Sequence, residues 1–152
     1  MPLACIGLGM WYAIATMEAG ESPSGAPEPQ RKGELLEQIS NSIVHLHSES
    51  FGRGPTGAKT YVMDDLVFCV LRDGLTPVER TLRDGGQGEF VREMRVRFQD
   101  AVEDQLRGMV EELTGRCVVA FLSQANVDPE LTIEVFFLDG PTGTNGSHET
   151  EA

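Results

Sequence analysis

The sequence predicts an α+β domain in which helices cover a small, mostly antiparallel three-stranded sheet, in the order α-β-α-α-β-β. Three observations lead to this fold class. Apolar residues recur every three or four positions in two stretches, as they do in amphipathic helices. An apolar run follows a glycine-rich turn, and two further runs near the end of the chain flank turn-forming residues. The folded unit is expected to span residues 33–139.

The first helix is expected from Glu34 to about Glu49. Its apolar positions recur at helical spacing and are Leu35, Leu36, Ile39, Ile43 and Leu46. Gly52 ends the helix, because glycine readily takes the backbone angles that close one. The turn GRGP over residues 52–55 then leads into the next element.

A single long strand is expected from Thr60 to Leu71. Residues 66–71 are apolar at every position, which predicts a central strand buried on both faces. Asp64 and Asp65 interrupt the apolar run. Adjacent strand residues point to opposite faces, so one of these two acids is expected to face inward and to pair with Arg53 or Lys59. Which of the two faces inward stays open.

Two helices are expected after this strand. The run Thr76-Pro77-Val78-Glu79 has the pattern of a capping box with proline at the first helical position, and predicts a short helix to about Arg83. A longer helix is expected from Glu89 to Thr114, closed by Gly115. Its expected core stripe is Val91, Met94, Phe98, Val102, Gln105 and Met109, widened by Leu106, Val110 and Leu113.

The chain is expected to end its fold in an antiparallel hairpin. Residues 117–122 (CVVAFL) and 131–138 (LTIEVFFL) are predicted strands, and the polar segment SQANVDPE between them is the predicted loop. In the preceding strand, Val67 and Leu71 oppose Leu66 and Val70, so a three-stranded sheet leaves one apolar face uncovered. A homodimer that covers this face is therefore expected.

The two ends of the chain are expected to lie outside the folded unit. Residues 1–17 are apolar, but shorter than the roughly 20 residues of a spanning helix and without the positive start of a secretory signal. Two alternatives stay open for this extension: a coding start placed too far upstream, with Met17 as the true start, or a weak lipid anchor. Residues 18–32 and the acidic tail over 140–152 are expected to be disordered.

Composition excludes several functions. A net charge of −12 argues against nucleic-acid binding and against adhesion to anionic lipid. The three cysteines, Cys5, Cys69 and Cys117, are widely separated, which indicates thiols in a reducing, cytoplasmic compartment rather than a metal site. His45 and His47 point to different sides of a helix. No nucleophile–base set is visible, so we expect no catalytic residues, no metal and no cofactor, and a protein that is not an enzyme.

The best candidate for a site is the glycine-rich turn GRGPTGAKT over residues 52–60. It differs from a phosphate-binding P-loop, because Ala58 stands where that loop needs lysine and because a strand, not a helix, follows. Two interpretations remain: a helix-to-strand connection shaped by glycines, or a surface for an anion or a protein partner. The candidate contact residues are Arg53, Gly54, Lys59, Tyr61, Asp64, Asp65, Ser123 and Asp128.

The runs HSESFGRGPTGAKTYVMDDLVFCVLRDGLTPVERTL and GRCVVAFLSQANVDPELTIEVFFL resemble the MpsC family. The resemblance covers about Leu35 to Leu138, and is most specific at residues 52–55 and 64–66. It implies a small bacterial domain, an accessory component of a Na⁺-translocating, membrane-potential-generating or bicarbonate-uptake system. Gly57 and Asn126 depart from the family pattern, and the resemblance implies no catalytic residues.

Two functional hypotheses follow. The first is a non-enzymatic accessory or regulatory interaction module, a homodimer that binds proteins of a membrane-transport complex without spanning the membrane itself. The alternative is a sensor of a small anion or a nucleotide, in which Arg53 and Lys59 hold the ligand on the glycine-rich turn.

Overall fold

The computed structural model describes residues 28–143. Its elements are α1 (Glu28–Phe51), β1 (Gly57–Met63), β2 (Leu66–Arg72), α2 (Pro77–Leu82), α3 (Gly88–Thr114), β3 (Val118–Val127) and β4 (Glu130–Leu138). Helix α1 begins inside the segment expected to be a linker, with Pro29 in its first turn, where a missing N–H costs no helical hydrogen bond. The predictions for Met17 and for the tail beyond residue 143 concern positions outside the described residues.

The sheet has four antiparallel strands in the order β1-β2-β4-β3, not three. The segment predicted as one strand over 60–71 is a hairpin, in which Met63 pairs with Leu66 across a two-residue turn. Asp64 and Asp65 form this turn, and Asp64 has a φ of 51°. The prediction that these acids lie on opposite faces of a strand was wrong. Aspartate tolerates left-handed backbone angles, so an acidic pair turns the chain without glycine.

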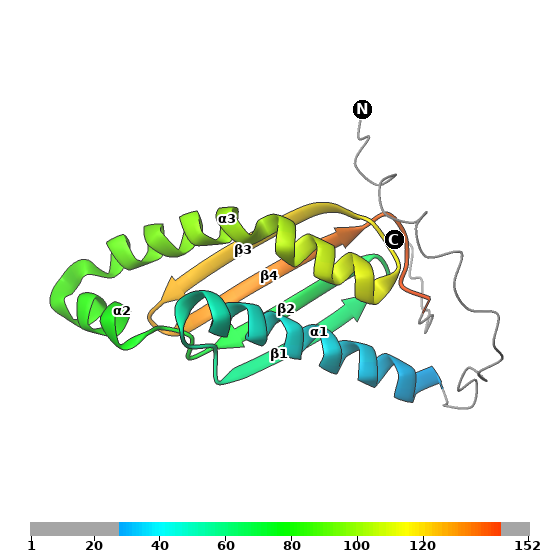
Figure 1. Ribbon diagram of the computed structural model, residues 1–152, viewed down its shortest axis with the longest axis horizontal. Helices are drawn as coiled ribbons and strands as arrows, with labels where there is room; N and C mark the ends of the chain where they lie inside the picture. The colour runs from blue at the N-terminus through cyan, green and yellow to red at the C-terminus, as the bar shows by residue number, and fades with distance from the viewer. Residues whose placement is uncertain (1–27, 144–152) are drawn as a thin grey trace, which may run out of the picture.

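Helices α1 and α3 lie side by side on one face of the sheet, and within residues 28–143 no helix covers its other face (Figure 1). The core between the two layers is formed by Ile39, Ile43, Val62, Val67, Cys69, Leu71, Val102, Leu106, Val110, Val118, Phe136 and Leu138. Burial raises the pKa of the Cys69 thiol to about 11. Cys69 is fully buried, as expected, whereas Cys117 is half-buried.

The two later helices follow their predicted boundaries closely. Thr76 caps α2 in a capping box with Glu79, as predicted. A wider turn at Arg83–Gln87, with Gly86 at a φ of 83°, joins α2 to α3. Gly115 closes α3 with a φ of 67°. The predicted core stripe of α3 was correct in part. Val91, Val102, Leu106 and Val110 are buried, and Phe98, Met109 and Leu113 are partly buried against the core. The stripe also contains Arg95 and Gln99, which an apolar pattern could not find because they are polar.

The last hairpin is longer than predicted. Its turn is Asp128-Pro129 alone, and β3 continues to Val127. Ser123 and Asn126 therefore lie in a strand rather than in a loop. The prediction failed because polar residues near the end of a strand resemble loop composition.

The GRGP turn depends on a close approach at Gly54. A Cβ at this position would overlap Ser48 Oγ and lie 3.0 Å from the Val44 carbonyl oxygen in α1. We therefore expect Gly54→Ala to lower the free energy of unfolding by about 1–3 kcal/mol, measured by urea denaturation.

Gly108→Ala is the matched control. Gly108 lies in α3 with open space around it, so alanine there should stabilise by about 0.5–1 kcal/mol. Equal effects at both glycines would contradict this account.

Candidate functional site

The candidate residues predicted from the sequence do not form one surface. Arg53, Gly54 and Asp128 lie at the end of the sheet where β1 and β4 begin. Asp64 and Asp65 form the turn at the opposite end. The other three are on the sheet itself, where Lys59 and Tyr61 belong to its uncovered face and Ser123 to the face beneath α3.

The two cations of the glycine-rich turn have separate surroundings. Arg53 donates a hydrogen bond of 3.0 Å to the carbonyl oxygen of Leu75, which joins the GRGP turn to the loop before α2. The Lys59 ammonium lies 5.2 Å from the centre of the Tyr61 ring. Among the described residues, neither cation forms an ion pair with Asp64 or Asp65, so the predicted pairing was wrong. The two acids form the turn between β1 and β2, at the end of the sheet opposite Arg53.

A buried ion pair organises the end of the sheet near α2. Arg95 Nε and Nη2 each lie 2.7 Å from a carboxylate oxygen of Glu79, and both residues are 2% exposed. Arg95 also donates to the carbonyl oxygen of Gly74. Burial by itself would raise the pKa of Glu79, but hydrogen bonds from Arg95 and from the Thr76 backbone outweigh it and lower that pKa. Removal of either side chain would leave the other as a buried charge without compensation, which is strongly destabilising.

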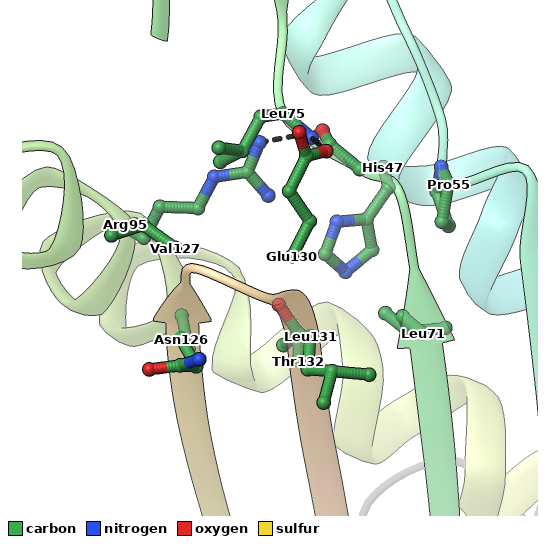
Figure 2. A pocket seen from close by; sticks show the side chains of 12 residues that line it. His47, Pro55, Leu71, Leu75, Arg95, Asn126, Val127, Glu130, Leu131 and Thr132 are labelled. Carbon is green, nitrogen blue, oxygen red and sulfur yellow. Dashed lines mark hydrogen bonds between the residues drawn. The ribbon is translucent and has the colours of Figure 1, made fainter. Parts of the chain in front are cut away.

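Glu130 makes a second charged cluster at the same end. It accepts hydrogen bonds from Arg80 at 2.8 and 3.0 Å, from Arg83 at 2.9 Å and from the Leu75 backbone at 3.3 Å. These hydrogen bonds, of which those from Arg80 have the largest effect, lower the pKa of Glu130 to about 2. Figure 2 shows Arg95 and Glu130 converging on the loop that carries Leu75. The start of β4 is thereby fastened to α2.

A third polar contact lies deeper, between α1 and β4. His47 Nε2 is 2.8 Å from Glu134 Oε1, and the two side chains are 2% and 0% exposed. Sequence reasoning missed this pair, as it missed the ion pair between Glu79 and Arg95. A signal was present, because His47 follows Ile43 by four residues and Glu134 precedes Phe136 by two, each in phase with a buried stripe. The position of His47 in the helical repeat and of Glu134 in the strand alternation would by itself have placed both side chains inside.

The cavity at this polar end is too small to act as a ligand site. It has a volume of about 10 Å³ and is lined by His47, Arg95, Glu130 and neighbouring residues, as Figure 2 shows. That volume is about the minimum for one water molecule. We therefore assign these charged residues to holding the loops together. Within residues 28–143, no three His, Cys, Asp or Glu side chains come together as a metal site would require.

The uncovered side of the sheet, here called the outer face, is the best candidate for a functional surface. The register places these residues on it: Gly57, Lys59, Tyr61, Met63, Leu66, Phe68, Val70, Arg72, Ala120, Leu122, Gln124, Asn126, Leu131, Ile133, Val135 and Phe137. Two of the rows that cross the sheet are wholly apolar. One is Met63, Leu66, Phe137 and Ala120, and the other is Tyr61, Phe68, Val135 and Leu122.

Exposure and charge both set the outer face apart. Met63 is 57% and Leu122 60% exposed, although half-solvated antiparallel sheets usually turn polar side chains to water. None of the residues that form the outer face is acidic, whereas the whole chain carries 24 acids and a net charge of −12. Lys59 and Arg72 are its charged members, and neither has an ion-pair partner among the described residues. Such a face fits a surface that another molecule covers.

In the part of the chain that the structure describes, no helix has both the length and the apolar character needed to cross a bilayer.

Comparison with known proteins identifies the family. The model for the family described as "Na+-translocating membrane potential-generating system (MpsC)" matches residues 31–140. The chain is also similar to the uncharacterized protein YbcI of Bacillus subtilis (strain 168), with 26% identity over 91 residues. That alignment covers 59% of this chain and 73% of YbcI. No solved structure matches significantly.

The Glu130 cluster predicts a pH dependence of stability. Its folded pKa of about 2 lies below the ordinary value of 4.5, so the stabilisation is complete above pH 4.5 and is lost as pH falls towards 2. We expect the free energy of unfolding to fall by on the order of 2–3 kcal/mol more in wild type than in Glu130→Gln between pH 6 and pH 2.5. Urea denaturation at each pH measures this difference. Glu112→Gln, on the exposed side of α3, is the control and should keep the wild-type profile. A Glu130→Gln profile parallel to wild type would contradict the assignment.

Proposed function

This chain belongs to the MpsC family, and we propose that it is a non-enzymatic accessory module of a Na⁺-translocating, membrane-potential-generating system, active as a homodimer. The observation that carries the proposal is the acid-free, largely apolar outer face of the sheet. The family description supports the system to which the module belongs. A cytoplasmic location is part of the proposal, because the widely separated cysteines favour a reducing compartment. The outer face supports the way in which it associates.

The size of the outer face suits a second copy of the chain. Four strands about 4.8 Å apart, taken over a length of about seven residues at about 3.3 Å per residue, give roughly 440 Å² in plan. The accessible area is larger, because side chains stand out from this plane. Stable interfaces bury about 800 Å² per partner, and weak ones bury less. A dimer closed through this face alone therefore belongs to the smaller, reversible class of interface.

Charge complementarity also favours a second copy. Lys59 and Arg72 lie at one end of the outer face, and the exposed Asp64-Asp65 turn lies just beyond its other end. When two copies pack face to face with their strands antiparallel, the cations of each meet the acidic turn of the other. The apolar rows then meet in the middle. This two-fold arrangement uses the same patch on both subunits, as an isologous dimer does.

A charge placed in the outer face should abolish dimerisation. We expect Leu122→Glu to give a monomeric mass by light scattering at concentrations where wild type is dimeric, because the new carboxylate would be buried without a partner. Val78→Glu is the matched control, since Val78 is 69% exposed on α2 and away from the sheet.

A charge swap tests the orientation of the two copies. Arg72→Glu should weaken the dimer about 2–5-fold, and the addition of Asp65→Arg should restore its affinity. A monomeric wild type at 100 μM would remove the homodimer.

The accessory role has its own test in the host. Deletion of the gene should lower the membrane potential held in Na⁺-containing medium, measured with a potential-sensitive dye. Wild type and Val78→Glu should restore the potential, and Leu122→Glu should not. An unchanged potential after deletion would contradict the role in such a system and would leave the dimer unaffected.

A further inference from the structure

The described core contains a cluster of polar atoms with no hydrogen-bond partner. In residues 28–143, these buried side-chain atoms are Gln99 Oε1 and Nε2, Ser123 Oγ and Glu134 Oε2. Ser123 and Glu134 are directly paired across β3 and β4 and share the inner face of the sheet. Gln99 comes from the buried stripe of α3 and is 4% exposed. Native proteins leave few such groups unpaired, and those that remain often mark a bound ion or water.

Two of these residues line one cleft. It lies between α3 and β3 and has a volume of about 210 Å³. Gln99 and Ser123 border it together with Val96, Asp100, Glu103, Phe121, Leu122 and Ala125. A water molecule occupies about 30 Å³ of liquid, so there is room for an ion with several waters. The cleft is thus far larger than the cavity at the polar end of the sheet.

The charged residues around the cleft favour a positively charged ligand. Asp100 and Glu103 border it, and no lysine or arginine does so among the described residues. Arg107 engages Glu103 at 2.7 Å, but Glu103 stays part of the wall. The unpaired oxygens of Gln99 and Ser123 are acceptors, which suit a cation. The unpaired amide Nε2 of Gln99 needs an acceptor, and a water bound to the cation supplies one.

We propose that the cleft between α3 and β3 binds a partly hydrated alkali cation. Gln99 Oε1 and Ser123 Oγ contact the ion, and its waters accept from Gln99 Nε2 and face Asp100. A small organic ammonium shares the charge but brings no water to the amide nitrogen. The proposed site does not rest on the proposed function: Gln99 and Ser123 lie on the helical side of the sheet, although Leu122 of the outer face also borders the cleft.

A thermal-shift titration on the full chain tests the site. Tetramethylammonium chloride is replaced stepwise by sodium, potassium or methylammonium chloride at constant total concentration, so that ionic strength does not change. Sodium or potassium should raise the Tm saturably, by about 4 °C at five times its Kd. For sodium, the ²³Na NMR linewidth should broaden with protein and saturate over the same range.

Two variants locate the site. Gln99→Met keeps the side-chain length and removes both amide atoms, so it should raise the Tm without cation and abolish the cation response. Ser123→Ala should weaken the response and serves where Gln99→Met does not fold. Gln105→Met, exposed on the same helix, is the matched control and should respond like wild type. Identical wild-type Tm values in all four chlorides would overturn the proposal, leaving a cleft that holds water. A response to methylammonium alone, or one that survives in Gln99→Met, would also overturn it.

Discussion

The ion pair between Glu79 and Arg95 is the interaction on which one end of this molecule depends. It joins the capped start of α2 to the first half of α3, and Arg95 also donates to the carbonyl oxygen of Gly74 in the loop before α2. Glu130 joins the start of β4 to α2 through Arg80. Arg53 joins the GRGP turn to the loop before α2 through the carbonyl oxygen of Leu75. Removal of one partner of a pair this deeply buried would leave a charge without compensation, at a cost of about 3–5 kcal/mol. The glycine-rich turn is thus held by the charged framework beside it.

The regular parts of the fold were predictable because their signals are local. Helical spacing in α1, the Thr76 capping box, the Gly115 stop and the apolar strands of the final hairpin all matched. The long strand failed for a physical reason: a two-residue aspartate turn has no glycine to mark it, so two strands resembled one. The extra strand changed the sheet and moved the acids away from Arg53. An uncovered apolar face was nonetheless predictable, because residues 66–71 are all apolar and alternate strand residues point to opposite faces of the sheet.

The candidate sites were harder to predict because they depend on contacts between distant segments. His47 and Glu134 are 87 residues apart, and Gln99 meets the sheet only through the packing of α3. An apolar pattern treats such polar positions as interruptions. Their phase within the helix or strand is the better guide, since a polar residue in phase with a buried stripe must find a partner or a ligand inside. Ser123 was predicted as a contact residue, but from its place in a supposed loop rather than from its inward direction.

The arrangement of helices on one face of the sheet affects the electrostatic repulsion between two copies of this acidic chain. The acids of α1 and α3 lie on the helical side of the sheet (Figure 1). If two sheets face each other about 10 Å apart, with helices about 10 Å thick behind each, the two helical layers are roughly 30 Å apart. The screening length in physiological salt is about 8 Å. Repulsion between the acidic layers is therefore almost fully damped in a face-to-face pair, whereas any approach through the helices meets it directly.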